Sequence, residues 1–259
     1  MKKWLSTNSR PALLFLFFLI VAWEALSRGL EVPEYIMPAP TNIVRALMSN
    51  FSLLLLHTKT TFLTAVIGLA LAIIVALVLA VLMDKVDILK KMIYPLLIIS
   101  QTIPIIALAP IMIIWFGLGV LPKILVVALV CFFPVAISLI NGLENVDREL
   151  IELMQIMGAK PSMIFSTVQF PAVLPYFFAG LKIAATYSVM GAVIGEWLGA
   201  SSGLGVYMLR TMHSYSTSSN FAAILIVVLL SMFIFKVTEL LAWLSMPWNR
   251  IKEEKTWEE

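Results

Sequence analysis

Long apolar stretches separated by short polar segments dominate the chain. Six of these stretches approach the length of a membrane span, and they lie at residues 11–27, 62–83, 93–116, 124–143, 176–197 and 221–243. A bilayer core requires about 20 apolar residues in a helix. The pattern therefore predicts an all-α membrane protein with six transmembrane helices.

The first stretch is the shortest and carries Glu24. Lys2 and Lys3 precede it and the segment Ala25-Leu-Ser27 resembles a cleavage site, so a signal peptide is the alternative interpretation. The length of the apolar part and the bulky Trp23 favour a retained span.

Composition excludes a soluble domain. With 61% hydrophobic and 13% charged residues, a chain of 259 residues cannot supply a soluble protein's charged surface. The basic pI of about 9.0 fits positively charged flanks of membrane spans and does not indicate nucleic-acid binding. The single cysteine, Cys131, lies in an apolar run, which excludes an internal disulfide and indicates a packing residue.

Lysine and arginine are distributed unevenly between the two sides that six spans define. The side of the termini carries Lys2, Lys3, Arg10, Lys85, Lys90, Lys91, Arg148, Lys160, Arg250, Lys252 and Lys255, and the opposite side carries Arg28, Arg45, Lys59, Lys123 and Arg210. Basic residues concentrate on the cytoplasmic side of membrane proteins. We therefore expect a cytoplasmic N-terminus at 1–10, a transmembrane domain at 11–245 and a cytoplasmic tail at 246–259.

The segment at about 145–171 lies on this cytoplasmic side. Its first part is an amphipathic helix in which Asn145 or Asp147 can cap the start and Gly158 can end the helix in a left-handed conformation. Pro161 suits the first turn of a second short helix, which would end at Pro171. One face carries Leu150, Leu153, Met154 and Met157, and the other carries Arg148, Glu149, Glu152 and Gln155. Such an element either rests on the lipid surface or protrudes to bind a partner protein. The pattern of apolar and polar residues is compatible with both.

The spacing within this segment resembles a known motif. Glu152, Gly158 and Val168-x-Phe170-Pro171 match the EAA motif of ABC-importer permeases, whose usual form is Glu-Ala-Ala-x3-Gly-x9-Ile-x-Leu-Pro. Leu153 and Met154 replace the two alanines, which implies a modified fit against the partner. Similarity to the branch that imports nitrate, sulfonates, taurine and thiamine precursors extends over residues 30–245, at Met37-Pro-Ala-Pro40, Gln101-Thr-Ile-Pro104, Trp115-Phe-Gly-Leu-Gly119 and Gly195-Glu-Trp-Leu-Gly199.

This resemblance implies a type I importer fold with a cytoplasmic coupling helix, in the inner membrane of a prokaryote. Two permeases, expected to form a homodimer, would be driven by two cytoplasmic ABC ATPase subunits and supplied by an external binding protein. The chain has no Gly-Lys dipeptide and hence no Walker A motif, so it is not itself an enzyme. ATP and magnesium would be used by the ATPase, and no cofactor is expected here. The coupling residues would be Glu152, Leu153, Met154, Gly158, Ala159 and Pro171.

The translocation pathway is expected along the span at 93–116. Three prolines there free backbone carbonyls, which is tolerable where a helix lines a cavity, although a kinked packing helix is the alternative. The pathway residues we predict are Ser100, Gln101, Thr102 and Pro104, together with Glu196, which would serve at an outer gate or face interfacial water. Gly191 and Gly195, four residues apart, indicate close helix packing.

The remaining charged residues within the spans and the two histidines are interpreted as structural residues, with no catalytic or metal-binding role. Lys182 can extend to the interface, and Lys236 and Glu239 are spaced to pair on one helix. His57 and His213 lack neighbouring cysteines or carboxylates at metal-ligand spacing. We predict no metal site and no catalytic residues.

Two functions of another class remain as alternatives. A secondary transporter or channel would need ionisable groups at mid-membrane and often shows inverted repeats, and neither is evident here. A membrane scaffold would use the cytoplasmic helix only to hold a partner. Within the importer interpretation, aromatic residues such as Trp197 and Tyr207 and the absence of an arginine cluster favour a pyrimidine or flavin-like vitamin precursor over nitrate, taurine or a sulfonate.

Overall fold

The computed structural model describes residues 9–248, so most of the predicted N-terminus at 1–10 and of the tail at 246–259 lies outside the described residues. Every regular element within this range is helical. The elements are α1 (Ser9–Gly29), α2 (Pro40–Ser49), α3 (Phe51–Lys85), α4 (Asp87–Ser100), α5 (Ile105–Phe116), α6 (Leu121–Glu144), α7 (Arg148–Ile156), α8 (Pro161–Ile164), the π-helix η1 (Phe165–Gln169), α9 (Phe170–Glu196), α10 (Leu204–His213) and α11 (Thr217–Ser245).

The predicted spans are present, with one correction. Five helical stretches are long and apolar enough to cross a bilayer, namely α1, α3, α6, the run Pro161–Glu196 and α11. The stretch predicted as one span at 93–116 is instead two helices, α4 and α5, bent by 107°. Pro104 is the N-cap of α5 and has an extended ψ of 119°. Proline disfavours helical backbone in the residue before it, so the helix ends ahead of Pro104 and restarts behind it.

A second correction concerns Pro171. The prediction of a short helix ending at this proline is wrong, because the helix runs on through α8, η1 and α9 as one stretch of 36 residues. The π-turn of η1 lies just before the proline, and the Phe170 N–H donates to the carbonyl of Phe165, five residues back. This wider turn lets the helix pass a residue that has no N–H of its own.

Helices α6 and α9 form the centre of the bundle because small residues let their backbones approach closely. A Cβ added at Gly191 would lie 3.2 Å from the Cα of Val127, and one added at Gly195 would lie 3.2 Å from the Cα of Lys123. Both glycines therefore face α6, as their four-residue spacing predicts. The core around this pair includes Cys131, Ala184, Val189 and Ala192, all buried.

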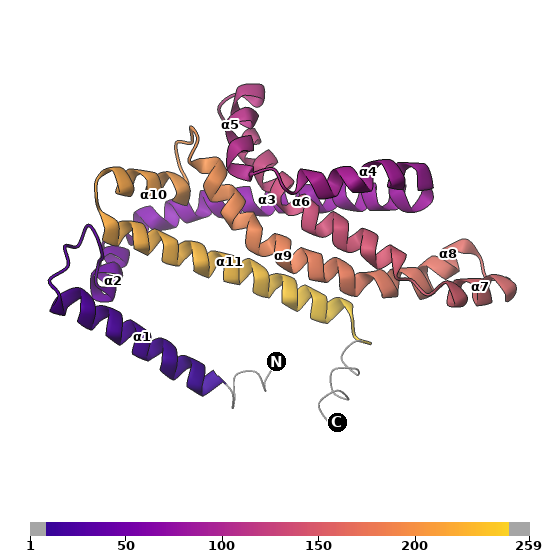
Figure 1. Cartoon of the computed structure of the whole chain (residues 1–259), viewed down its shortest axis with the longest axis horizontal. Coiled ribbons are helices and arrows are strands. Elements are labelled where there is room, and N and C mark those ends of the chain that lie inside the picture. The colour runs from indigo at the N-terminus through magenta and orange to yellow at the C-terminus, as the bar shows by residue number, and fades with distance from the viewer. Residues whose placement is uncertain (1–8, 249–259) are drawn as a thin grey trace.

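The short helices occupy opposite ends of the molecule. Figure 1 shows α2 and α10 at one end of the long axis and α7 and α8 at the other. The amphipathic helix α2 packs its buried Ile43 into a cluster with Leu54, Leu204, Tyr207, Ala222 and Ala223. It is thus held by protein contacts at one end of the bundle, whereas α7 projects from the other.

Candidate coupling helix and translocation segment

Helix α7 begins and ends with local signals that the sequence predicts. Asp147 is its N-cap, and the side chain accepts a hydrogen bond from the N–H of Glu149 at 2.9 Å. At the other end Gly158 has a φ of +77°. The Gly158 N–H donates to Gln155 at 2.9 Å and the Ala159 N–H donates to Met154 at 2.9 Å. These two bonds form a Schellman motif, which stops the helix and reverses the chain.

The surface of α7 carries apolar side chains with nothing packed on them. None of its residues is buried. Ile156 is 84% exposed and the adjoining Met157 is 77% exposed, and Leu150 and Leu153 are also exposed. Ile151 points the other way and packs against the core. A short helix with two half-buried side chains, Ile151 and Met154, and further apolar side chains left bare is suited to dock into a groove on another protein.

The predicted coupling residues cluster around this element. Glu152 and Leu153 are exposed, whereas Met154 and Ala159 are half-buried. Pro171 lies apart, near the start of α9. Ile156 was not predicted, although it is the most exposed apolar residue of α7. Ile156 was missed because it lies outside the apolar face predicted from the spacing of Leu150, Leu153, Met154 and Met157.

The four pathway residues predicted around position 100 lie together at the break between α4 and α5. Ser100 Oγ donates to the carbonyl of Leu96 at 2.6 Å, and Thr102 Oγ1 donates to that of Ile99 at 2.7 Å. Both hydroxyl groups bond to carbonyls at the end of α4, and the Ile99 carbonyl also accepts the N–H of Thr102 at 3.0 Å. Gln101 and Pro104 are exposed. The break therefore presents polar groups and irregular backbone on the surface of the chain.

Glu196 belongs to a different environment. It is 1% exposed and so does not face interfacial water. Its carboxyl group accepts the N–H of Gly205 at 2.8 Å, and Thr61 Oγ1 lies 2.9 and 3.1 Å from its two oxygens. Thr61 in turn accepts the N–H of Leu204 at 2.8 Å. Glu196 and Thr61 together cap the first turn of α10 from two neighbouring helices.

His57 completes this capping cluster, which we define as His57, Thr61 and Glu196 with the N–H groups of residues 203–205. His57 Nδ1 accepts the N–H of Gly203 at 2.9 Å. Both His57 and Thr61 are buried. Thr61 could not be recognised from the sequence, because Glu196 and Leu204, which it bonds across the fold, lie more than 130 positions away along the chain. Its hydroxyl group also lies 3.2 Å from the carbonyl oxygen of His57 in its own helix.

Two further charged groups, Glu239 and Glu24, make structural contacts. Lys236 Nζ and Glu239 Oε2 are 2.5 Å apart, which confirms the predicted pair on α11. Glu24, in the first span, accepts Arg28 Nε at 2.5 Å and the N–H of Thr41 at 3.0 Å. Its carboxyl group thereby ties the end of α1 to the start of α2.

The sequence is similar to those of permease subunits of known transport systems. Residues 68–247 match the family described as binding-protein-dependent transport system inner membrane component. The chain is 39% identical to the formylaminopyrimidine transport permease protein ThiX of Halalkalibacterium halodurans, over 92% of this chain and 95% of that protein. It is 32% identical to the riboflavin transport system permease protein RibX of Chloroflexus aurantiacus, over 90% of this chain and 88% of that protein.

A solved structure shares the fold. An inward-facing structure of the MetNI methionine ABC transporter has a chain that superposes with a TM-score of 0.61 at 22% identity, covering 74% of this chain and 95% of that chain. The chain belongs to the family of inner-membrane components of binding-protein-dependent transport systems and is a permease subunit of an ABC importer.

Proposed function

We propose that α7 is the element through which a separate cytoplasmic ATPase drives this permease. The observation that carries the proposal is the bare apolar face of α7, held by a defined cap and a Schellman motif. Ile156, Met157 and Leu153 would enter a groove of the ATPase, and Glu152 would make a polar contact beside them. Gly158 and Ala159 would fix the reversal of the chain, and Pro171 would lie where the helix enters the bundle.

The same proposal fixes the orientation. The end of the molecule that carries α7 would face the cytoplasm, together with both termini. The basic residues near that end support this orientation, and they are Lys85, Lys90, Lys91, Arg148 and Lys160. The capping cluster and α2 would then lie on the outer side, where a binding protein delivers the cargo.

A second copy of this chain would cover the break between α4 and α5. Irregular backbone at membrane depth is tolerated only where protein covers it or where it lines a water-filled cavity. The apolar residues around the break are exposed, including Ile99, Ile103 and Ile106. Two copies facing each other here would enclose a pathway lined by Ser100, Gln101, Thr102 and Pro104. Glu196 would act at the outer end of that pathway by fixing α10.

The cargo we propose is a small aromatic organic solute of the pyrimidine or flavin class. Two relatives that align over most of their length are named for formylaminopyrimidine and riboflavin transport. ATP-driven closure of the ATPases would move the two α7 helices and swing the spans between outward and inward openings. The external binding protein would contribute most of the selectivity.

Reconstitution tests this function. The permease would be placed in proteoliposomes with its ATPase and binding protein, and uptake of labelled formylaminopyrimidine, riboflavin and taurine would be measured. We expect uptake of one of the two aromatic solutes that requires ATP hydrolysis and stops in a hydrolysis-deficient ATPase. Uptake that continues without hydrolysis would contradict an ATP-driven mechanism, and uptake of taurine alone would contradict the proposed cargo.

A further inference from the structure

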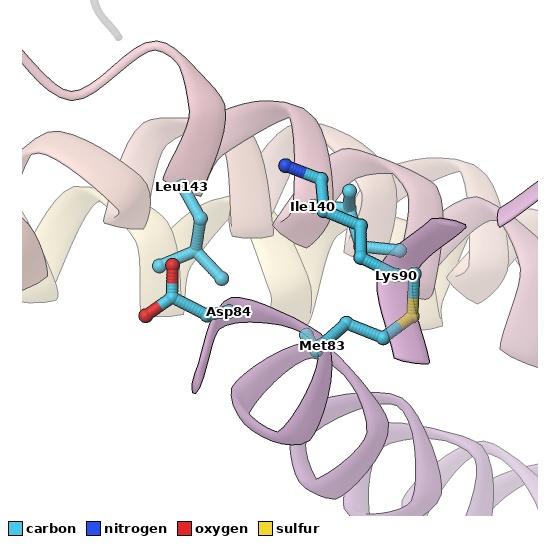
Figure 2. Close-up of a pocket in the computed structure, with 6 residues that line it drawn as sticks. Met83, Asp84, Lys90, Ile140 and Leu143 are labelled. Atoms are coloured by element: carbon cyan, nitrogen blue, oxygen red, sulfur yellow. The ribbon is translucent and has the colours of Figure 1, made fainter. Parts of the chain in front are cut away.

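One ion pair joins two helices at the base of the proposed coupling element. Lys90 Nζ in α4 lies 2.8 Å from Glu144 Oε1 in α6. The other two ion pairs within residues 9–248, Arg28–Glu24 and Lys236–Glu239, each lie within a single helix. Figure 2 shows the Lys90 side chain reaching from α4 toward α6, which carries Ile140 and Leu143.

Glu144 is placed at the root of α7. It is the last residue of α6. Val146, two residues on, is buried, and Asp147 then caps α7. Only three residues separate Glu144 from the start of α7, so its carboxylate lies within about one helical turn of the element proposed to move.

Lys90, the partner of Glu144, belongs to the helix that leads to the proposed pathway residues. It is in the first turn of α4, and α4 runs from there to the break at Ser100–Pro104. Helix α4 contacts chiefly α3, to which it is joined by the single residue Val86, and it buries Leu97 in the core of the bundle. The ion pair therefore supplies a direct link from the root of α7 to the helix that carries the proposed pathway residues.

Other charged groups near Lys90 do not offer the same link. Asp84 lines the small pocket beside Lys90 with Met83, Ile140 and Leu143, but it belongs to α3 and is not within ion-pair distance. Figure 2 shows its carboxylate pointing toward Leu143. Asp87 lies in α4 itself and cannot tie α4 to another helix.

The pair is exposed enough to contribute little to stability. The side chains of Lys90 and Glu144 are 34% and 43% exposed. Such pairs typically contribute about 0.2–1 kcal/mol to folding. Loss of a contact of this size should leave the fold in place, so its removal tests the connection between the two helices without unfolding them.

We propose that Lys90 and Glu144 are positioning residues that transmit the movement of α7 to α4 and so to the break in the pathway. The proposal rests on the proposed function of α7 as the ATPase dock. Breaking the pair would leave ATPase binding and hydrolysis in place while loosening their connection to transport. Restoring it with the charges exchanged would restore the connection.

The test compares Lys90→Glu, Glu144→Lys and the double exchange in the reconstituted complex with its ATPase. Lys91→Glu is the matched control, since Lys91 is the next residue and is exposed without an ion-pair partner within residues 9–248. We expect each single variant to lower uptake per ATP hydrolysed by about three- to fivefold, consistent with the loss of one such pair. The double exchange should return the ratio to within about twofold of the unmodified protein.

The outcomes distinguish failure of the proposed ion-pair link from failure of the proposed transport function. If Lys90→Glu lowers the ratio no more than Lys91→Glu, or if the double exchange fails to restore it, the pair does not transmit the movement. If Glu144→Lys fails to assemble, the ratio for Lys90→Gln measured against Lys91→Gln decides in the same way. If the unmodified complex shows no ATP-dependent uptake, the proposed function itself is contradicted, irrespective of the pair.

Discussion

Replacing Thr61 with valine should destabilise the end of the permease that carries α10, although the two side chains have nearly the same volume. The side chain is fully buried and its hydroxyl group contacts the carboxyl oxygens of Glu196 at 2.9 and 3.1 Å. The same oxygen accepts the N–H of Leu204 at 2.8 Å. Valine fills nearly the same space but removes both interactions, so a buried carboxyl group loses one partner and a buried N–H loses its only cap.

The structure allows an estimate of the cost. A buried donor or acceptor left without a partner costs about 1–3 kcal/mol, and Glu196 keeps the N–H of Gly205 as a remaining partner. The two losses together should cost about 2–5 kcal/mol, which corresponds to a fall of about 5–15 °C in Tm for a chain of this size. Thr61→Ser keeps the hydroxyl group and should stay close to the unmodified protein.

The assay is thermal unfolding of the detergent-purified permease, followed by size-exclusion chromatography after heating. Thr64→Val is the matched control, because Thr64 is buried in the same helix and its hydroxyl group donates only to Thr60 within that helix, at 3.0 Å. We expect Thr61→Val to lower Tm at least three times as much as Thr64→Val. Equal effects of the two substitutions would refute the capping role of Thr61.

Two further substitutions test other parts of the structure. Gly158→Val places a β-branched residue at a φ of +77°, at a cost of about 1–2 kcal/mol confined to the end of α7. Membrane insertion and Tm should therefore change little while uptake per ATP falls, and normal coupled uptake would argue against the Schellman stop as a coupling feature. Gly191→Leu forces α6 and α9 apart, because even a Cβ there lies 3.2 Å from Val127. It should cost about 1–3 kcal/mol in thermal unfolding, whereas Gly29→Leu, with nothing within 4 Å, should be nearly neutral; similar losses from both would contradict the close packing.

Local features of α7 were predictable from the sequence because each depends on a few neighbouring residues. The cap at Asp147, the left-handed Gly158 and the proline that starts α8 all follow from backbone preferences that act within one helical turn. The spans were predictable for the same reason, since a run of about 20 apolar residues suffices to identify one.

The break in the third hydrophobic stretch, at 93–116, could not be located from the sequence. Pro95 and Pro110 lie inside helices α4 and α5, whereas Pro104 lies at the bend. All three have the same intrinsic effect on the backbone, so the packing of α4 and α5 against their neighbours decides which one ends a helix. The effect of Pro171 could not be predicted either, because a π-turn just before it lets the helix continue past the proline.

The capping cluster lay beyond sequence reasoning for another reason. Glu196 could be recognised as an unusual charge near the end of a span, but its partner Thr61 is 135 residues away. A threonine in an apolar helix commonly bonds to its own backbone, as Thr58 does here. Thr61 also lies 3.2 Å from the carbonyl oxygen of His57 in its own helix, so only the folded arrangement reveals its additional bonds to Glu196 and Leu204.

Binding of the ATPase to α7 is the most direct test of the account. Ile156→Asp introduces a charge at an apolar side chain that is 84% exposed, and Ile36→Asp is the control on an exposed apolar residue outside the α7 segment. Burying an unpaired charge in the interface should cost several kcal/mol. We expect Ile156→Asp to lower the amount of co-purified ATPase at least about tenfold while Ile36→Asp leaves it unchanged. Full recovery of the ATPase with Ile156→Asp, together with normal ATP-driven uptake, would contradict the assignment of α7 as the coupling helix.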